Sequence, residues 1–230
     1  MKSSTYRWNP EFAPTTVRRA VSSHVTTGSV PVGGGWQHDG MSMRPLDISW
    51  LCGEYAEECY SFIYIRAAPE QVVARLGGRW EDFTPGPFPD DPDYYSCSGE
   101  PLGVTSIGDW TFVFDRDWLG TREDVITKLS EGTRLVSQAA LAIKDMDDFY
   151  WCEDGEIRFA RDGYDGYLTK IPDELMDTMA EIDRLYPSGP QLFRGPAFLL
   201  VEHLTGIRVT EHLLKGSTLM WGVVPDLAKS

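Results

Sequence analysis

The sequence predicts an α+β fold: a mostly antiparallel sheet of five or six strands, helices chiefly on one face, and a helical C-terminal third. Three observations in residues 109–162 lead to this prediction. Trp110 to Phe114 is a compact apolar and aromatic run of the kind that strands favour. A helix follows, with Thr121 near its start and Gly132 at its end. Two further apolar runs then flank residues 153–155, Glu-Asp-Gly, which is typical of a tight hairpin turn.

Three more elements are predicted before this unit, and a further strand is predicted within it. Apolar residues at helical spacing predict a helix over residues 47–59, and residues 60–65 form an apolar run that predicts a strand. Proline at the first position and glycine at the end predict a short helix over residues 69–77. Residues 135–143 predict another strand of the same sheet.

Proline and glycine divide the last third of the chain into three predicted helices. Pro172 begins the first, which carries one apolar stripe. Residues 196–205 form the second, which Gly206 ends, and Thr210 caps a short third helix that ends at Gly216. These helices are expected to cover the sheet.

The first 43 residues differ from the rest in composition. They are rich in Ser, Thr, Gly, Pro and Val, include three consecutive glycines from Gly33, and show no persistent helical or strand period. We therefore predict a disordered tail at 1–43 and a single α+β domain at 44–230. A start of translation at Met41 or Met43 is an alternative explanation of the tail.

The chain is strongly acidic, with a formal net charge of −14. Binding to nucleic acid or to an anionic membrane needs a basic face, so the charge argues against both. A basic protein partner, a cationic ligand and simple solubility remain compatible with it.

The four cysteines are Cys52, Cys59, Cys97 and Cys152. Their spacing matches no zinc motif, and no signal peptide or apolar run of about 20 residues is present. We therefore predict reduced thiols, with Cys152 buried in a strand, and a cytoplasmic protein.

No reaction motif stands out, so we assign no catalytic, cofactor-binding or metal-binding residue. His203 and His212 are nine residues apart and do not form a zinc-hydrolase pair. The acids between Asp145 and Asp148 are better explained by a turn than by a cation site. Cys97 lies in an acidic segment, which disfavours a reactive thiolate.

Residues 80–115 combine eight acids with eight aromatic residues and contain no Lys, Arg or His. Four prolines between Pro85 and Pro92 predict a long loop in the first half of this segment. Exposed tyrosines anchor interfaces well, and nearby carboxylates steer basic partners. The residues predicted to contact a partner are Tyr94, Tyr95, Asp90, Asp91, Asp93, Asp147, Asp148 and Glu153.

From residue 60 onward the chain resembles a family of uncharacterised proteins from high-GC Gram-positive bacteria, known only as a domain of unknown function. The matching segments are residues 62–66, 69–73, 76–77, 108–112, 120–122, 129–133, 153–156 and 204–208. The resemblance extends over about three quarters of the chain, and its pattern is moderately specific. The resemblance implies no activity and transfers no functional residue.

These observations favour a non-enzymatic binding protein that holds a basic protein partner on an acidic, aromatic surface, as an immunity-type or regulatory protein would. The alternative is an enzyme or small-ligand binder with a pocket between the sheet and the C-terminal helices. Tyr94, Asp115 and Asp147 would then be its polar groups. A third possibility is an accessory protein whose charge serves solubility alone. The sequence does not indicate the oligomeric state.

Overall fold

One antiparallel sheet, five α-helices and short 3₁₀ helices make up the regular structure in the part of the chain that the structure, a computed structural model, describes. This part comprises residues 49–51, 59–89, 101–115, 117–141, 146–162, 166–187 and 195–225. All of it falls within the compact unit Arg44–Ser230. The predicted tail at 1–43 lies outside the described residues.

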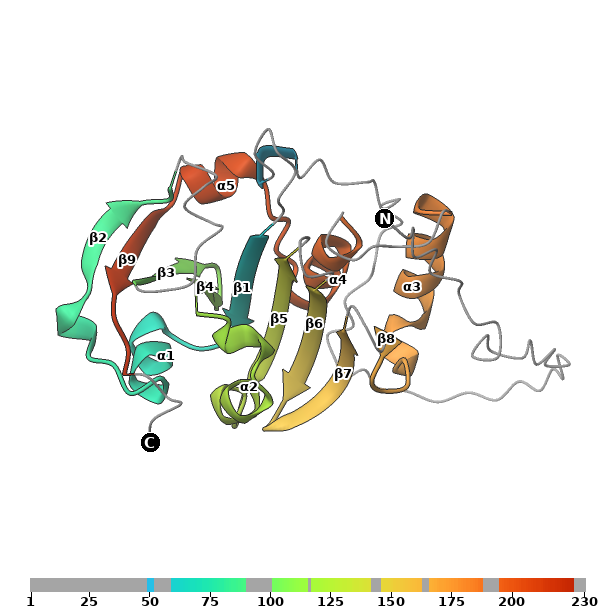
Figure 1. The fold of residues 1–230 in the computed structure, drawn as a ribbon, viewed down its shortest axis with the longest axis horizontal. Helices are drawn as coiled ribbons and strands as arrows, with labels where there is room; N and C mark the ends of the chain where they lie inside the picture. The colour runs from blue at the N-terminus through green and yellow to red at the C-terminus, as the bar shows by residue number, and fades with distance from the viewer. Residues whose placement is uncertain are drawn as a thin grey trace, which may run out of the picture. The chain divides into compact units, whose positions relative to one another are not determined.

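The sheet has nine strands in these residues, in the order β2-β9-β3-β4-β1-β5-β6-β7-β8, and every neighbouring pair is antiparallel (Figure 1). The antiparallel α+β architecture agrees with the sequence, but the predicted count of five or six strands is wrong. The strands are β1 (Cys59–Ile65), β2 (Thr84–Pro87), β3 (Leu102–Ile107), β4 (Trp110–Phe114), β5 (Arg134–Leu141), β6 (Met146–Glu153), β7 (Glu156–Asp162), β8 (Gly166–Tyr167) and β9 (Thr218–Gly222).

The last third of the chain was predicted to be helical, but it contains a strand, which is a second correction. β9 enters the sheet between β2 and β3, two strands that precede it by more than a hundred residues. β2 itself falls in the segment predicted to be a loop because of its prolines. It carries Pro85 and Pro87 at the edge of the sheet, where a strand can lack backbone donors on its outer side.

The helices lie on both faces of the sheet, whereas the sequence predicted them chiefly on one. They are α1 (Pro69–Arg75), α2 (Glu123–Leu129), α3 (Asp173–Leu185), α4 (Pro196–Thr205) and α5 (Glu211–Lys215). Successive residues of a strand point to opposite faces, so each strand supplies both sides of the core.

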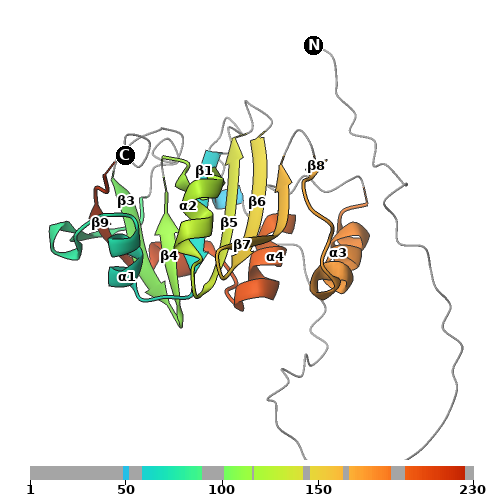
Figure 2. The ribbon, with the colours of Figure 1, turned by 90° about the horizontal axis from the view of Figure 1, so that it is seen from below.

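On one side, α1 and α2 pack on aliphatic residues such as Ile63, Val113 and Leu135; we call this side the aliphatic face (Figure 2). On the other side, Phe198 of α4 packs against Tyr60 and Phe62, with ring centroids 5.5 and 6.4 Å away. We call this side the aromatic face. α4 is buried along most of its length because residues 196–201 are all apolar and therefore leave no polar side in that part of the helix.

Local signals located most element ends correctly. The hairpin between β6 and β7 turns at Asp154 and Gly155, which both have positive φ, as a two-residue turn requires. α4 occupies the predicted range and ends at Gly206, and the Thr210 hydroxyl accepts the N–H of Leu213 at the start of α5. The predicted helix at 47–59 lies mostly outside the described residues, and its last residue belongs to β1.

Candidate functional site

The aliphatic face becomes polar at one end, where Ser61, Asp115 and Ser137 are all buried. Ser61 reaches this face from β1, Ser137 from β5, and Asp115 follows the last residue of β4. The Ser61 hydroxyl donates a hydrogen bond to Asp115 Oδ2 at 2.9 Å. This bond links β1 to the residue that follows β4.

Asp115 fastens the loop between β4 and α2 onto the sheet. Its Oδ2 accepts the backbone N–H of Gly120 at 3.0 Å, and its Oδ1 accepts that of Asp117 at 2.9 Å. The Ser137 hydroxyl donates to the Gly120 carbonyl at 2.5 Å. The N–H and the carbonyl of Gly120 thus both bind buried side chains. These hydrogen bonds fix the loop and the start of α2, which follows it in the chain.

Gly120 allows this close approach because it has no side chain. A Cβ at this position would lie 2.6 Å from Ser137 Oγ and 3.0 Å from Ile63 Cγ1. Contacts this short do not occur without displacement of the neighbours. Glycine at position 120 therefore allows the loop to rest on the sheet without displacing Ser137 or Ile63.

Burial raises the pKa of the Asp115 carboxyl to about 6, and the hydrogen bonds from Gly120, Asp117 and Ser61 oppose that rise. A carboxyl with this pKa is suited to proton transfer near neutral pH. However, Asp115 is only 2% exposed, so a substrate does not reach it in this conformation. Its role in the structure is to hold the loop.

Beside this loop, Tyr150 of β6 lies among carboxylates on the aliphatic face. Asp148 is two residues away on the same strand and therefore on the same face. Tyr150 pairs with Ala160 and Phe149 with Arg161, so the same register places Asp148 opposite Asp162 of β7. Glu123, the first residue of α2, also lies near the ring.

The phenol of Tyr150 stays neutral in this setting. Burial raises its pKa to about 12, with further contributions from Asp148, Glu123 and Asp162. Burial likewise raises the pKa of the neighbouring Cys152 thiol to about 12, so that the predicted buried cysteine is not a nucleophile. In the part of the chain described, no three His, Cys, Asp or Glu residues are placed to hold a metal ion.

On the aromatic face, Asp147 forms an ion pair with Arg161 of β7. Arg161 Nη1 lies 2.6 Å from Asp147 Oδ2 and 3.3 Å from the Asp147 carbonyl oxygen. The two side chains are 13% and 6% exposed. This pair joins two neighbouring strands inside the core.

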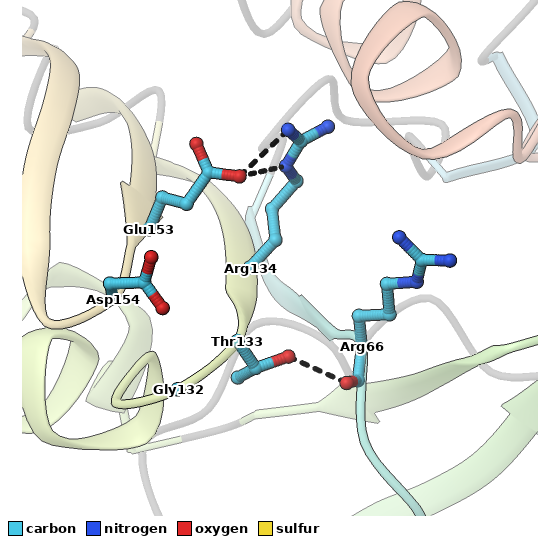
Figure 3. A pocket seen from close by; sticks show the side chains of 6 residues that line it. All are labelled: Arg66, Gly132, Thr133, Arg134, Glu153 and Asp154. Carbon is cyan, nitrogen blue, oxygen red and sulfur yellow. Dashed lines mark hydrogen bonds and ion pairs between the residues drawn. The ribbon is translucent and has the colours of Figure 1, made fainter. Parts of the chain in front are cut away.

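A polar depression of about 320 Å³ opens at the end of the sheet where β1 ends and β5 begins (Figure 3). It is lined by Arg66, Gly132, Thr133, Arg134, Glu153 and Asp154. Glu153 Oε1 accepts hydrogen bonds from Arg134 Nε and Nη2 at 3.0 and 2.7 Å. The Arg134 guanidinium also lies over the Trp151 ring, 5.5 Å from its centroid. In this depression Arg134 and Glu153 thus bind each other, and the Thr133 hydroxyl donates to the Arg66 carbonyl oxygen at 2.6 Å.

The structure separates the predicted partner residues that it describes. β6 carries Asp147, Asp148 and Glu153, and strand alternation places Asp148 on the aliphatic face and the other two on the aromatic face. Asp147 and Glu153 bind arginines of the same chain. The remaining predicted residues lie outside the described residues: Tyr94, Tyr95, Asp90, Asp91 and Asp93.

The pocket residues of the alternative function do not converge either. Asp115 and Asp147 lie on opposite faces of the sheet, and Tyr94 lies outside the described residues. The rings of Phe198, Tyr60 and Phe62 fill the space between α4 and the centre of the sheet.

Sequence reasoning missed Glu123, Tyr150 and Asp162. Asp148 and Tyr150 are two residues apart, and strand alternation could have placed both on the same face of the sheet. The position of Asp162 depends on the register of β6 with β7, and that of Glu123 depends on the loop held by Asp115.

None of the helices described is both long enough and apolar enough to cross a bilayer.

Comparison with known proteins identifies the family of this chain. The model of the "Family of unknown function (DUF6461)" matches residues 41–229, most of the chain, so the protein belongs to that family. No curated protein and no solved structure matches the chain.

Proposed function

We propose that this member of the family is a non-enzymatic binding protein, of an immunity or regulatory type, that holds a basic protein partner on an acidic, aromatic surface. The observation that carries the proposal is the gathering of Asp148, Glu123 and Asp162 around Tyr150. Three separate elements bring these carboxylates to one aromatic ring. The net charge of −14 supports the same conclusion.

The charge gives this surface a physical role in association. The carboxylates of Asp148, Glu123 and Asp162 attract a basic partner at a distance and speed its encounter with the protein. Association of this kind weakens as ionic strength rises, because salt screens the exposed charges.

Among the predicted partner residues, Asp148 belongs to this surface. Asp147 and Glu153 are assigned no contact with the partner, because Arg161 and Arg134 bind their carboxylates. The acidic and aromatic segment around Tyr94 and Tyr95 remains part of the proposal on the strength of its sequence.

The proposed setting is the cytoplasm of a high-GC Gram-positive bacterium, as the resemblance and the cysteine content suggest. A non-enzymatic role is supported by the inaccessibility of Asp115 and the neutral, buried thiol of Cys152.

The proposal is tested by capturing partners of the tagged protein from a lysate of its own host at low and high salt, followed by mass spectrometry. We expect one stoichiometric basic protein at low salt and much less of it at high salt. Glu123→Lys should abolish its capture, whereas Asp177→Lys, at an exposed acid on α3, should leave it unchanged. Capture that is indifferent to salt and to both substitutions would contradict the proposal.

A further inference from the structure

Arg66 differs from the other arginines of this acidic protein. Every other arginine that the structure describes pairs with a carboxylate, except Arg75, which donates to the Leu129 carbonyl oxygen. The Arg66 guanidinium has no hydrogen bond or ion pair within the described residues, although the chain carries 35 acids against 21 lysines and arginines. Its exposed side chain lines the polar depression (Figure 3). Its five N–H donors are therefore open to an anionic group from outside.

Arg134 adds a second guanidinium beside the first. The Arg66 N–H donates to the Arg134 carbonyl oxygen at 3.0 Å, so the two residues lie next to each other where β1 ends and β5 begins. Arg134 uses Nε and Nη2 on Glu153 Oε1, which leaves its Nη1 without a partner within the described residues. Figure 3 shows both guanidinia on the same side of the depression. Donors arranged in this way suit a carboxylate, whose two oxygens accept from planar guanidinium groups.

Asp154 provides a negative charge on the opposite side of the depression. Its carboxylate is exposed, has no hydrogen bond or ion pair within the described residues, and lies across from the Arg66 guanidinium (Figure 3). Glu153 lies next to it in the chain and binds Arg134. The depression therefore has a cationic side and an acidic side, and the charges of its two arginines and two acids cancel.

Thr133 holds the backbone of both unpaired residues in place. Its hydroxyl donates to the Arg66 carbonyl oxygen at 2.6 Å, and its own carbonyl oxygen accepts the Asp154 N–H at 2.9 Å. One residue thus fixes the origins of the two unpaired side chains relative to each other. A site with such an ordered backbone loses less conformational entropy when a ligand binds.

The distribution of charge favours a zwitterion over a simple ion. The arginines would attract a simple anion, but Asp154, Glu153 and the net charge of −14 would repel it. The two guanidinia would in turn repel a simple cation. An α-amino acid carries a carboxylate for the cationic side and an ammonium for the acidic side. The volume of about 320 Å³ also suits a small molecule, because ligand sites span about 300–1,000 Å³.

We infer that the depression lined by Arg66, Arg134, Glu153 and Asp154 binds a free α-amino acid. Arg66 and the Nη1 group of Arg134 donate to its carboxylate, and Asp154 accepts N–H groups of its ammonium. Strand alternation places Glu153 and Tyr150 on opposite faces of the sheet. The inference therefore goes beyond the proposed function and does not depend on the surface around Tyr150.

The test titrates each of the common L-amino acids into the isotope-labelled full chain and follows backbone amide shifts by NMR spectroscopy. We expect at least one amino acid to bind at millimolar concentration or below and to shift the amides of Gly132, Thr133 and Asp154. Two analogues of the best binder then separate its charges. Its methyl ester lacks the carboxylate and its α-hydroxy acid lacks the ammonium, so each should bind about tenfold more weakly.

Variants of the two unpaired residues test the same assignment from the side of the protein. Arg66→Gln and Asp154→Asn should each weaken binding of the best amino acid by about tenfold, as the loss of a hydrogen bond to a charged group predicts. Both side chains are exposed, and asparagine tolerates the φ of +54° at position 154, so the unfolding midpoints should match that of the wild type. Arg79→Gln, at an exposed arginine outside the depression, should leave the affinity within about twofold.

Three results would overturn the amino-acid site. The first is an absence of binding by every amino acid tested, and the second is binding that Arg66→Gln and Asp154→Asn leave unchanged. The third is an α-hydroxy acid that binds as tightly as the amino acid, because Asp154 would then recognise no ammonium. Capture of the basic partner from lysate should be the same for Arg66→Gln and wild type, so the proposed function is decided by a separate experiment.

Discussion

Two buried aspartates lie on opposite faces of one sheet, and their surroundings differ. Asp147, on the aromatic face, lies 2.6 Å from the guanidinium of Arg161. Among the described residues, Asp115, on the aliphatic face, accepts hydrogen bonds from a hydroxyl and two backbone amides. An opposite charge favours the ionised carboxylate directly, whereas neutral donors leave part of the desolvation cost of the charge in place.

The difference shows two uses of the same residue type. The Asp147–Arg161 pair connects two neighbouring strands, and its contribution depends on both members being present. Asp115 instead organises backbone: it fixes the loop that precedes α2 and thereby places Glu123. The four predictions below run from the largest expected effect to the smallest.

Removal of the arginine on the aromatic face should have the largest effect. Arg161→Met takes the guanidinium away from a buried carboxylate and should lower the free energy of unfolding by about 3–5 kcal/mol, measured by urea denaturation. Replacing both members, as Arg161→Met with Asp147→Leu, should recover most of that loss because no buried charge remains. Arg134→Met, at a pair with side chains about one third exposed, should cost roughly 1 kcal/mol. If Arg161→Met is no less stable than Arg134→Met, the predicted difference in stability between the buried pair and the partly exposed pair is wrong.

Asp115, whose hydrogen-bond partners are neutral, should make the free energy of unfolding depend on pH. The folded pKa of Asp115 is about 6, above its ordinary value of 3.8, so the folded state binds more protons than the unfolded state between these values. The contribution of Asp115 is therefore fully present below about pH 4 and is lost as pH rises through about 6. The loss amounts to about 3 kcal/mol.

Asp115→Asn checks this pH dependence, because an amide does not titrate. Unfolding free energies measured from pH 4 to 7 should fall more steeply for the wild type than for the variant. Parallel curves for the two proteins would show that Asp115 has an unshifted pKa.

Gly120 tests how closely the loop approaches the sheet. Gly120→Ala should reduce the free energy of unfolding by about 1–3 kcal/mol, because the added methyl group overlaps Ser137 Oγ. Gly108→Ala is the matched control: it has free space around it but a φ of +59°, so its cost of about 1 kcal/mol comes from the backbone alone. Adding Ser137→Ala to Gly120→Ala should recover part of the loss, whereas adding it to Gly108→Ala should not.

The smallest effect is expected at a fully exposed ion pair. Arg79 lies 2.9 Å from Glu81, with both side chains about two thirds exposed. Solvent screens such a pair, so Arg79→Ala should leave the thermal midpoint unchanged. A large fall in the midpoint would mean that the exposure of an ion pair does not predict its contribution to the stability of this protein.

Local signals predicted elements well where a few adjacent residues decide the conformation. The Glu-Asp-Gly turn, the cap at Thr210 and the end of α4 at Gly206 were found where the sequence placed them. The helix after β4 was also predicted, although its N-cap is Arg122 rather than Thr121. Turn and cap preferences act within four or five residues, so a sequence can express them directly.

The errors concern elements that depend on distant partners. β2 was predicted to be a loop because of its prolines, and it is a strand because β9 pairs with it residue by residue from Thr84 to Pro87. α4 was predicted to cover the same face as the other helices. Residues 196–201 are apolar on every side and do not orient the helix, so packing against Tyr60 and Phe62 decided its position.

The sequence by itself determined an acidic, antiparallel α+β protein with most of its turns and helix ends, because composition and short-range backbone preferences depend on neighbouring residues alone. Only the tertiary structure decided which acids share a surface. Asp147 and Asp148 are adjacent in sequence, yet one is buried beside Arg161 and the other lies near Tyr150. Strand alternation separates them, and the register of β6 with β7 then brings Asp162 opposite Asp148, a relation that arises only when distant segments hydrogen-bond.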